Sequence, residues 1–235
     1  FIQKGKSFLD VKTILIDSRR VSNAEESIFV AVKGDCNNGH KFISEAYQKG
    51  VCAFIVDEDV NLNLIEDAWV IKVHNTLLCL QLMAHKHLSS FHFPVIGITG
   101  SNGKTIVKEW LYQLLKDEFN IVKNPKSYNS QVGVPLSVWQ CNSEHNFGMF
   151  EAGVSKPGEM GALEYMIQPT IGVFTNLGGA HDENFKSWDV KAKEKLRLFE
   201  NSKVLIYCRD FLPVHNLITK KSHFRELKTF TWSKK

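Results

Sequence analysis

Short apolar runs separated by polar turns occupy the chain up to about residue 90. The runs have the length and composition of buried strands, and a helical stretch covers residues 40–49. A further helix is expected from about Asn75, and Pro94 marks a boundary after it. The pattern predicts a small α/β domain with its own core over residues 1–92. Its strand-like runs are residues 13–17, 27–32, 53–56 and 68–73.

From residue 93 onward, apolar runs alternate with helical stretches. Such alternation favours a mostly parallel sheet covered by helices. We therefore predict an α/β chain of two domains, the second formed by residues 93–235. The strand-like runs are residues 94–99, 147–151, 170–175 and 203–208, and a helix is expected over residues 187–200.

A glycine-rich turn follows residues 94–99 and ends in Gly-Lys-Thr. Gly100 and Gly103 would let backbone N–H groups approach a polyphosphate at the positive end of a helix dipole. Lys104 would add a charge for the outer phosphates, and Thr105 a hydroxyl for the Mg²⁺ that accompanies ATP. Apolar residues then recur at helical spacing: Ile106, Val107, Trp110, Leu111, Leu114, Leu115 and Phe119.

The spacing of this turn departs by one residue from the usual phosphate-binding pattern, because Ile98 stands where the first glycine is expected. The alternative is an ordinary strand-to-helix turn that contains Gly-Lys-Thr by chance. Both flanking elements are present, so we predict that the turn, including Ser101 and Asn102, binds the phosphates of ATP.

Polar residues also end two other predicted strands. Glu151 closes the run 147–151, and Thr175 and Asn176 close the run 170–175. Ligands gather at the carboxyl ends of parallel strands, so these groups and the glycine-rich turn are expected to converge on one edge of the sheet. For Glu151 the alternative is a solvated carboxylate at a strand end.

Composition sets broad limits on function. The 235 residues are 43% hydrophobic and 23% charged with a formal net charge of +4, as in ordinary globular proteins. The lysines are scattered, so no nucleic-acid partner is implied. The five cysteines lack C-x-x-C pairing, which favours a reducing cytoplasm over a disulfide framework or a zinc site. No apolar stretch approaches the roughly 18 residues expected of a membrane span.

Four segments of the second domain together resemble the central domain of the Mur ligases, whose glycine-rich turn also lacks the first glycine. They are the glycine-rich turn, Tyr128-Asn-Ser-Gln-Val-Gly-Val-Pro135, Glu151-Ala-Gly-Val-Ser-Lys-Pro-Gly-Glu159 and Thr175-Asn-Leu-Gly-Gly-Ala-His181. Residues 17–21, 27–34 and 38–42 resemble the UDP-sugar domain of the same family. Two separate regions of the chain therefore indicate one family.

The resemblance implies an ATP- and Mg²⁺-dependent amide ligase of peptidoglycan precursor synthesis that acts through an acyl phosphate. Residues 1–92 would bind the UDP-muramyl substrate, and residues 93–235 would bind ATP. The segment from Glu151 to Glu159 and the Gly-Val-Pro at 133–135 are most similar to members that add D-alanyl-D-alanine to UDP-N-acetylmuramoyl-tripeptide. The runner-up is the addition of the third amino acid. The family's third domain is not matched, so the chain is expected to be inactive alone.

The resemblance also assigns roles around the nucleotide. Lys104 would neutralise the transferring phosphoryl group, and Thr105 would hold the first Mg²⁺. Glu151 matches a magnesium-binding glutamate, and His181 matches a histidine that binds the second magnesium. A histidine after Gly-Gly-Ala is, by itself, more typical of a plain loop.

The helical segment that begins at Lys191 resembles the family segment whose lysine becomes carbamylated and coordinates magnesium. Alignment on its closing Leu-Phe selects Lys195, and Lys193 is the competitor. Composition alone describes only a basic helix face. Lys104, Lys195 and His181 are thus the expected catalytic residues.

Five residues are expected at the substrate. Asn129 and Ser130 correspond to a family segment near the γ-phosphate, although Ser130 departs from the more frequent Asn-Asn and a plain turn is the alternative. Ser18, Arg19 and His40 are expected to line the uridine or pyrophosphate site, because arginine suits bidentate phosphate contacts. Arg19 could equally form a surface ion pair.

Two other classes compete with the ligase interpretation. A non-catalytic P-loop module would not require Glu151, His181 and Lys195. A GTPase is disfavoured because no Asn-Lys-x-Asp segment occurs. Ligases similar to folylpolyglutamate synthase share the phosphate-binding turn but lack the N-terminal UDP-sugar domain.

Overall fold

The computed structural model describes residues 4–5, 10–34, 37–179, 182–220, 224 and 227–234. The chain forms two compact units, which divide between Leu82 and Met83. This division falls inside helix α2 (Thr76–Leu88), before residue 92, where the sequence suggests the boundary. Each unit has a sheet and a core of its own.

The first unit contains a four-stranded parallel sheet with the order β1-β2-β3-β4. Phe29 and Phe54 pair across β2 and β3, with ring centroids 6.2 Å apart, and both are fully buried. Helix α1 (Ile43–Gln48) contributes Ile43 and Ala46 to the same core. The expected small α/β unit is confirmed. Its strands are β1 (Thr13–Leu15), β2 (Ser27–Val30), β3 (Ala53–Val56) and β4 (Trp69–Lys72).

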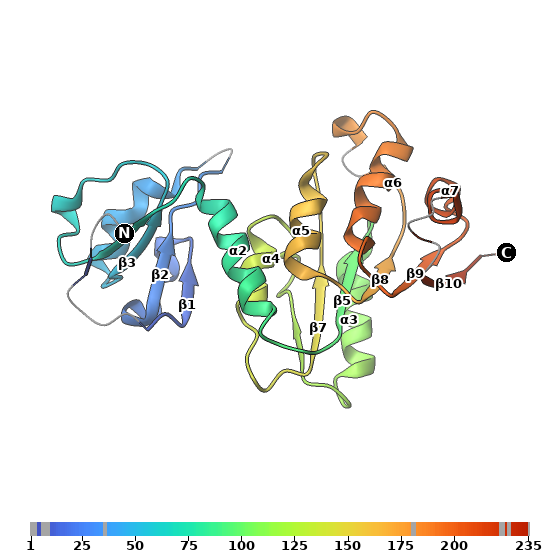
Figure 1. Ribbon diagram of the computed structural model, residues 1–235, viewed down its shortest axis with the longest axis horizontal. Helices are drawn as coiled ribbons and strands as arrows, with labels where there is room; N and C mark the ends of the chain where they lie inside the picture. The colour runs from blue at the N-terminus through green and yellow to red at the C-terminus, as the bar shows by residue number, and fades with distance from the viewer. Residues whose placement is uncertain are drawn as a thin grey trace. The chain divides into compact units, whose positions relative to one another are not determined.

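The second unit is built on a six-stranded parallel sheet with the order β10-β9-β8-β5-β7-β6. Figure 1 shows β8, β9 and β10 side by side, with α7 next to them. Since β5 lies between β7 and β8, the carboxyl ends of these three strands are neighbours. The strands are β5 (Val95–Thr99), β6 (Ile121–Lys123), β7 (Phe147–Glu151), β8 (Ile171–Phe174), β9 (Val204–Cys208) and β10 (Lys228–Trp232).

Helices cover the sheet of the second unit and bury its apolar side chains in two clusters. One cluster joins α4, α5, α6 and α7 to the strands, and the other joins α3 to β5, β6 and β7. This arrangement confirms the expected α/β class with a mostly parallel sheet. The helices are α3 (Lys104–Leu115), α4 (Gly133–Val138), α5 (Glu159–Ile167), α6 (Trp188–Leu196) and α7 (Leu212–Lys220).

The apolar residues of α3 are only partly buried. Val107 and Leu111 pack against the sheet with Leu115. Ile106 and Trp110, in contrast, are exposed by 58% and 65%. The helix expected from this spacing is present, but three of its apolar positions, Ile106, Trp110 and Leu114, face solvent.

None of the helices in the described ranges has the length and apolar run that crossing a bilayer requires.

Candidate functional site

The glycine-rich turn links β5 to α3 and needs both of its glycines, for different reasons. Gly100 has φ +148°, and a Cβ there would lie 2.0 Å from Thr175 Oγ1. Gly103 has φ +76° with open space around it, so the requirement there is conformational. The turn thus lies tightly against the residues that follow β8.

Those residues bond the turn in place. Asn176 accepts from two N–H groups of the turn, through its carbonyl from Ser101 (2.9 Å) and through its Oδ1 from Asn102 (2.9 Å). Thr175 Oγ1 donates to the Asn102 carbonyl at 2.7 Å, and Ser101 Oγ both donates to and accepts from the backbone of Gly178. The N–H groups of Ser101 and Asn102 are therefore already bonded within the protein, which leaves other groups of the turn to meet a phosphate.

Two lysines from different helices converge on the turn. Lys104 Nζ donates to the Gly100 carbonyl at 3.0 Å, and Lys195 Nζ, from α6, donates to the same oxygen at 3.1 Å. Burial lowers the pKa of Lys104, with a partly offsetting effect from Glu151. Two lysine side chains held together beside a glycine turn form an anion site, since a polyphosphate would favour the protonated form of both.

Lys195 has the more perturbed environment of the two. Its side chain is 2% exposed, and burial, followed by the charges of Lys104 and Lys191, lowers its pKa to about 7, while Glu194 acts in the opposite direction. Lys191 is also buried and donates to the Gly178 carbonyl at 2.5 Å. A substantial share of Lys195 is therefore a neutral amine near pH 7.

Glu151 supplies a carboxylate at the end of β7, next to the turn. It is fully buried, and its Oε1 accepts from Thr105 Oγ1 (3.2 Å) and Asn129 Nδ2 (3.0 Å). Its Oε2 is buried, and no described residue forms a hydrogen bond with it. Thr105 Oγ1 also lies 3.0 Å from Ser127 Oγ. A bare carboxylate oxygen and the nearby hydroxyl of Thr105 are oxygen ligands of the kind that Mg²⁺ prefers, so these residues fit the ion.

A loop over residues 124–130 positions the amide that touches Glu151. Asn124 is buried, and its side chain accepts from the Glu151 N–H (2.6 Å) and donates to the Tyr128 carbonyl (2.6 Å). A Cβ on Gly153 would lie 2.7 Å from Asn129 Oδ1, so this glycine makes room for the amide. Asn129 is thus held against Glu151 from two sides.

Ser130 has a local structural partner. Its Oγ accepts from the Gly133 N–H at 3.0 Å, at the start of α4. It also lines a small hollow of about 210 Å³ together with Gln131 and Glu159. The hydroxyl therefore orders the turn before α4.

Ser18 and Arg19 lie in the first unit, and Arg19 forms an ion pair with the neighbouring Asp17. Arg19 meets both carboxylate oxygens of Asp17, at 2.9 and 2.8 Å, and this bonding lowers the pKa of Asp17 to about 2. Ser18 is buried, and its carbonyl accepts from Lys49 Nζ at 2.9 Å. The Arg19 side chain is 82% exposed, so its guanidinium edge remains open to solvent.

His40 is bonded through both ring nitrogens. Its Nδ1 lies 2.8 Å from Asn38 Oδ1, and its Nε2 accepts from the N–H groups of Asp57 (3.1 Å) and Glu58 (3.3 Å). This arrangement requires the tautomer protonated at Nδ1. The ring therefore ties the loop after β3 to the 38–40 turn, a role that its position in the sequence did not indicate.

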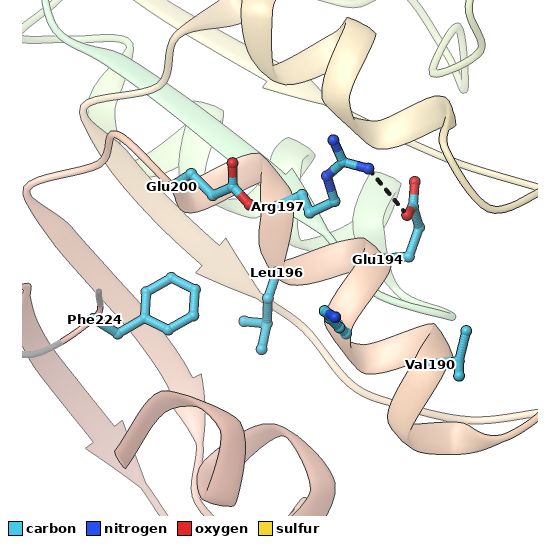
Figure 2. A pocket seen from close by; sticks show the side chains of 7 residues that line it. Val190, Glu194, Leu196, Arg197, Glu200 and Phe224 are labelled. Atoms are coloured by element: carbon cyan, nitrogen blue, oxygen red, sulfur yellow. Dashed lines mark ion pairs between the residues drawn. The ribbon is translucent and has the colours of Figure 1, made fainter. Parts of the chain in front are cut away.

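His181 lies outside the described residues. Lys193 and Lys195, the two candidates on α6, differ in burial. Lys193 is exposed and lines a separate hollow of about 400 Å³, whereas Lys195 is buried and reaches the glycine turn. Figure 2 shows this hollow along α6 and the following turn, with Arg197 directed at Glu194 (3.7 Å). Among the candidates, the structure brings Lys104, Lys195, Thr105, Glu151 and Asn129 together around the turn.

Sequence reasoning missed the buried lysines Lys108 and Lys191. Lys108 is fully buried on α3, and its Nζ lies 3.6 Å from Glu151 Oε2. Its position one turn after Lys104, between the apolar Val107 and Leu111, was the available signal. A lysine on the buried side of an amphipathic helix requires internal partners.

Comparison with protein families agrees with this geometry. The Mur ligase middle domain matches residues 98–235, and the Mur ligase family catalytic domain matches residues 10–86. The chain belongs to the Mur ligase family. The expected family is thus confirmed over most of the Mur ligase chain, in both of its units.

Two curated relatives of this Mur ligase chain share one protein name. UDP-N-acetylmuramoyl-tripeptide--D-alanyl-D-alanine ligase of Bacillus subtilis is 32% identical over 84% of the chain and 43% of its own length. The ligase of that name from Treponema pallidum is 34% identical over 79% of the chain and 42% of its own length. The chain spans less than half the length of these curated relatives.

A solved structure gives the same result for the fold. The MurF ligase from Thermotoga maritima, in complex with ADP, aligns with a TM-score of 0.83 and 28% identity. The alignment covers 98% of this Mur ligase chain and 52% of that one. The parallel sheets of the two units are therefore those of a Mur ligase fold.

Proposed function

We propose that this chain carries the nucleotide and muramyl-substrate sites of an ATP-dependent ligase that joins D-alanyl-D-alanine to UDP-N-acetylmuramoyl-tripeptide. The observation that carries the proposal is the convergence of side chains at the glycine turn. Lys104 and Lys195 both donate to the Gly100 carbonyl. Beside them, the buried carboxylate of Glu151 has one oxygen to which no described residue donates a hydrogen bond. The names of the relatives supply the substrates. Because the chain spans less than half of those relatives, we assign it the binding and activation steps.

The proposed reaction has two steps. A carboxylate oxygen of the muramyl tripeptide attacks the γ-phosphorus of ATP, the bond to the β,γ-bridging oxygen breaks, and an acyl phosphate and ADP form. The amine of D-alanyl-D-alanine then attacks the acyl carbon, loses a proton and expels phosphate, which leaves the amide. Both steps crowd negative charge, so positioning and cationic neutralisation are the main catalytic demands.

In this scheme, Lys104 faces the β- and γ-phosphates and neutralises the charge that develops on the transferred group. It is well placed because its ammonium already lies over the turn, 3.0 Å from the Gly100 carbonyl. Gly100 and Gly103 let the backbone approach the phosphates. The N–H groups of Ser101 and Asn102 shape the turn through their bonds to Asn176.

Thr105 and Glu151 would hold Mg²⁺, with Asn129 orienting the carboxylate through Oε1. The bound ion supplies charge neutralisation across the phosphates. Lys195 and His181 are proposed as further metal-site groups, with Lys195 acting as its carbamate. That adduct forms from a neutral amine and CO₂, and the lowered pKa of Lys195, about 7, supplies the neutral amine. Lys193, in contrast, is exposed.

The N-terminal part, up to about residue 92, is proposed to bind the UDP-muramyl group. Ser18 and Arg19 remain candidates for the uridine or pyrophosphate, since Arg19 presents an exposed guanidinium that Asp17 holds in place. His40 would act by ordering the loop after β3. Ser130, beside Asn129, is proposed near the γ-phosphate side of the substrate. The cytoplasm is the proposed location, because ATP and UDP-linked precursors are made and used there.

The proposal is tested by calorimetric titration of the chain with UDP-muramyl tripeptide and, separately, UDP-muramyl dipeptide, each with Mg²⁺ and a non-hydrolysable ATP analogue. Tighter binding of the tripeptide supports the D-alanyl-D-alanine reaction. Tighter binding of the dipeptide would favour addition of the third residue instead. Nucleotide binding without either muramyl ligand would favour a non-catalytic nucleotide-binding module.

A further inference from the structure

Lys108 is a buried cation to which the proposed reaction gives no task. Its side chain is fully buried on α3, and a lysine in that position is costly unless its charge and its protons are satisfied. Its Nζ donates to the Asn124 carbonyl at 2.7 Å and also to the Lys126 carbonyl. Two carboxylates lie slightly farther away, Glu109 Oε1 at 3.4 Å and Glu151 Oε2 at 3.6 Å.

The loop that Lys108 bonds is strained. Lys126 has φ +50°, in the left-handed region that residues with a side chain rarely adopt. Such a conformation persists only where its surroundings fix it. The side chain of Lys126 is exposed, whereas its carbonyl is held by the buried ammonium of Lys108. Lys108 is therefore one of the contacts that keep this loop in its observed shape.

The same loop carries groups of the metal side of the site. Directly after Lys126, Ser127 Oγ lies 3.0 Å from Thr105 Oγ1, and Asn129 Nδ2 donates to Glu151 Oε1 at 3.0 Å. A shift of the loop would therefore move the partners of both expected metal ligands. Lys108 connects α3, which begins with the phosphate-binding lysine, to that loop.

The distance from Lys108 to Glu151 also matters. At 3.6 Å, the ammonium of Lys108 balances the charge of the Glu151 carboxylate, but in the described part of the chain Oε2 has no hydrogen-bond donor. The protons of Lys108 are directed instead to the two loop carbonyls. Glu151 thus lies beside a positive charge, while its Oε2 stays available to a cation.

We propose that Lys108 is a positioning residue for the divalent cation of the nucleotide site: by bonding the carbonyls of residues 124 and 126 it holds the loop that orients Thr105 and Glu151. This inference rests on the proposed function, since it concerns the cation that would accompany ATP. Lys108 itself contacts neither the ion nor the nucleotide.

The charge and the hydrogen bonds of Lys108 have opposite expected effects on cation binding. By Coulomb's law, removing a positive charge near Glu151 strengthens the binding of a cation. Losing the two hydrogen bonds frees the loop and weakens that binding. A neutral substitution that weakens cation binding therefore reports on geometry, because the change in charge acts in the other direction.

The test uses the full 235-residue chain and two neutral variants, Lys108→Met and Lys108→Gln. Only glutamine keeps a donor for the loop carbonyls, so the pair separates hydrogen bonding from charge. Lys116→Met, at the exposed end of α3, is the matched control. Binding of Mn²⁺ in the presence of a non-hydrolysable ATP analogue is followed by electron paramagnetic resonance, and binding of the analogue without metal is followed by calorimetry in EDTA.

We expect Lys108→Met to weaken Mn²⁺ binding by about tenfold or more, a magnitude typical of groups that orient metal ligands. Lys108→Gln should weaken it less, Lys116→Met should leave it unchanged, and metal-free nucleotide binding should persist in all variants. If Lys108→Met fails to fold, as judged by its thermal unfolding, Lys108→Gln decides the question by its own Mn²⁺ affinity.

Unchanged or tighter Mn²⁺ binding in the neutral variants, with a wild-type chain that binds both ligands, would overturn this inference and leave the proposed function intact. Equal losses in metal-free and metal-dependent nucleotide binding would also overturn it, because they would indicate a general structural role. A wild-type chain that binds no nucleotide with Mn²⁺ would overturn the proposed function together with this inference.

Discussion

Replacing Lys195 by methionine should remove a pH dependence from the stability of the chain. Lys195 is 2% exposed, and burial together with the charges of Lys104 and Lys191 lowers its pKa from 10.5 to about 7. Below pH 7 the lysine is protonated in both the folded and the unfolded chain, so the whole cost of the buried charge is present. The lowering of the pKa corresponds to about 5 kcal/mol at ~1.4 kcal/mol per pH unit.

The sign follows from proton binding. Between pH 7 and 10.5 the unfolded chain binds more protons than the folded chain at this residue, so the free energy of unfolding rises with pH. From pH 7 to pH 9, Lys195 should contribute a rise of about 2 kcal/mol, because the folded chain is still about half protonated at this residue at pH 7, and Lys195→Met should lack that contribution. The variant also loses the hydrogen bond to the Gly100 carbonyl, which shifts its stability by a constant amount.

The assay is urea unfolding of the wild-type chain and of Lys195→Met at several pH values between 6 and 9, in CO₂-free buffer so that the amine stays unmodified. Lys193→Met, on the exposed side of the same helix, is the control and should follow the wild type. Parallel pH profiles for the wild type and Lys195→Met would refute the argument, since the buried charge would then have no measurable cost.

Two further predictions concern the frame of the site. Gly100→Ala should abolish nucleotide binding and destabilise the chain, because its Cβ would lie 2.0 Å from Thr175 Oγ1. Gly103→Ala should lower the free energy of unfolding by only about 1–2 kcal/mol, because of its positive φ. Equal urea midpoints for the two variants would contradict this ranking. Glu194→Leu should destabilise the chain by about 2–3 kcal/mol in urea, because it leaves the N–H groups of Gly158 and Met160, at the start of α5, without the acceptor they share. Glu194→Gln, which keeps the acceptor oxygen, should cost less, and equal losses in the two variants would argue against the hydrogen bonds as the cause.

The proposed nucleotide side of the site could be predicted from the sequence because its signals are local. A strand, a glycine turn and a helix adjoin one another, and Glu151 ends a strand that pairs with β5 in the register that brings it beside the turn. Parallel sheets with helical crossovers make such convergence predictable. The strand-end position of Glu151 therefore led to the correct edge of the sheet.

Other elements gave weaker signals. All five residues of β10 are exposed, so no buried pattern marks it as a strand. Helix α4 begins at Gly133 and contains Pro135, so its sequence is typical of a turn. β10 forms through its parallel pairing with β9, and α4 forms where Val134 and Val138 pack into the core, and neither contact can be read from the segment alone.

The side-chain contacts of the site could not be predicted from the sequence, for a different reason. The resemblance selects Lys195 over Lys193, but the burial of Lys195 depends on which face of α6 packs inward. The hydrogen bonds of His40 depend on a loop 17 residues away. The role of Lys108 depends on carbonyls of a strained loop. Such contacts arise from tertiary packing and leave no periodic trace in one sequence.

The central claim is that the glycine turn, Thr105 and Glu151 together hold a nucleotide with a divalent cation. The most direct measurement is a crystal structure of the chain with Mn²⁺ and a non-hydrolysable ATP analogue, with the cation located by its anomalous scattering. The account predicts an anomalous peak bonded to Thr105 Oγ1 and Glu151 Oε2, with the phosphates over Lys104. A nucleotide bound away from the turn, or a cation that does not touch Glu151, would contradict it.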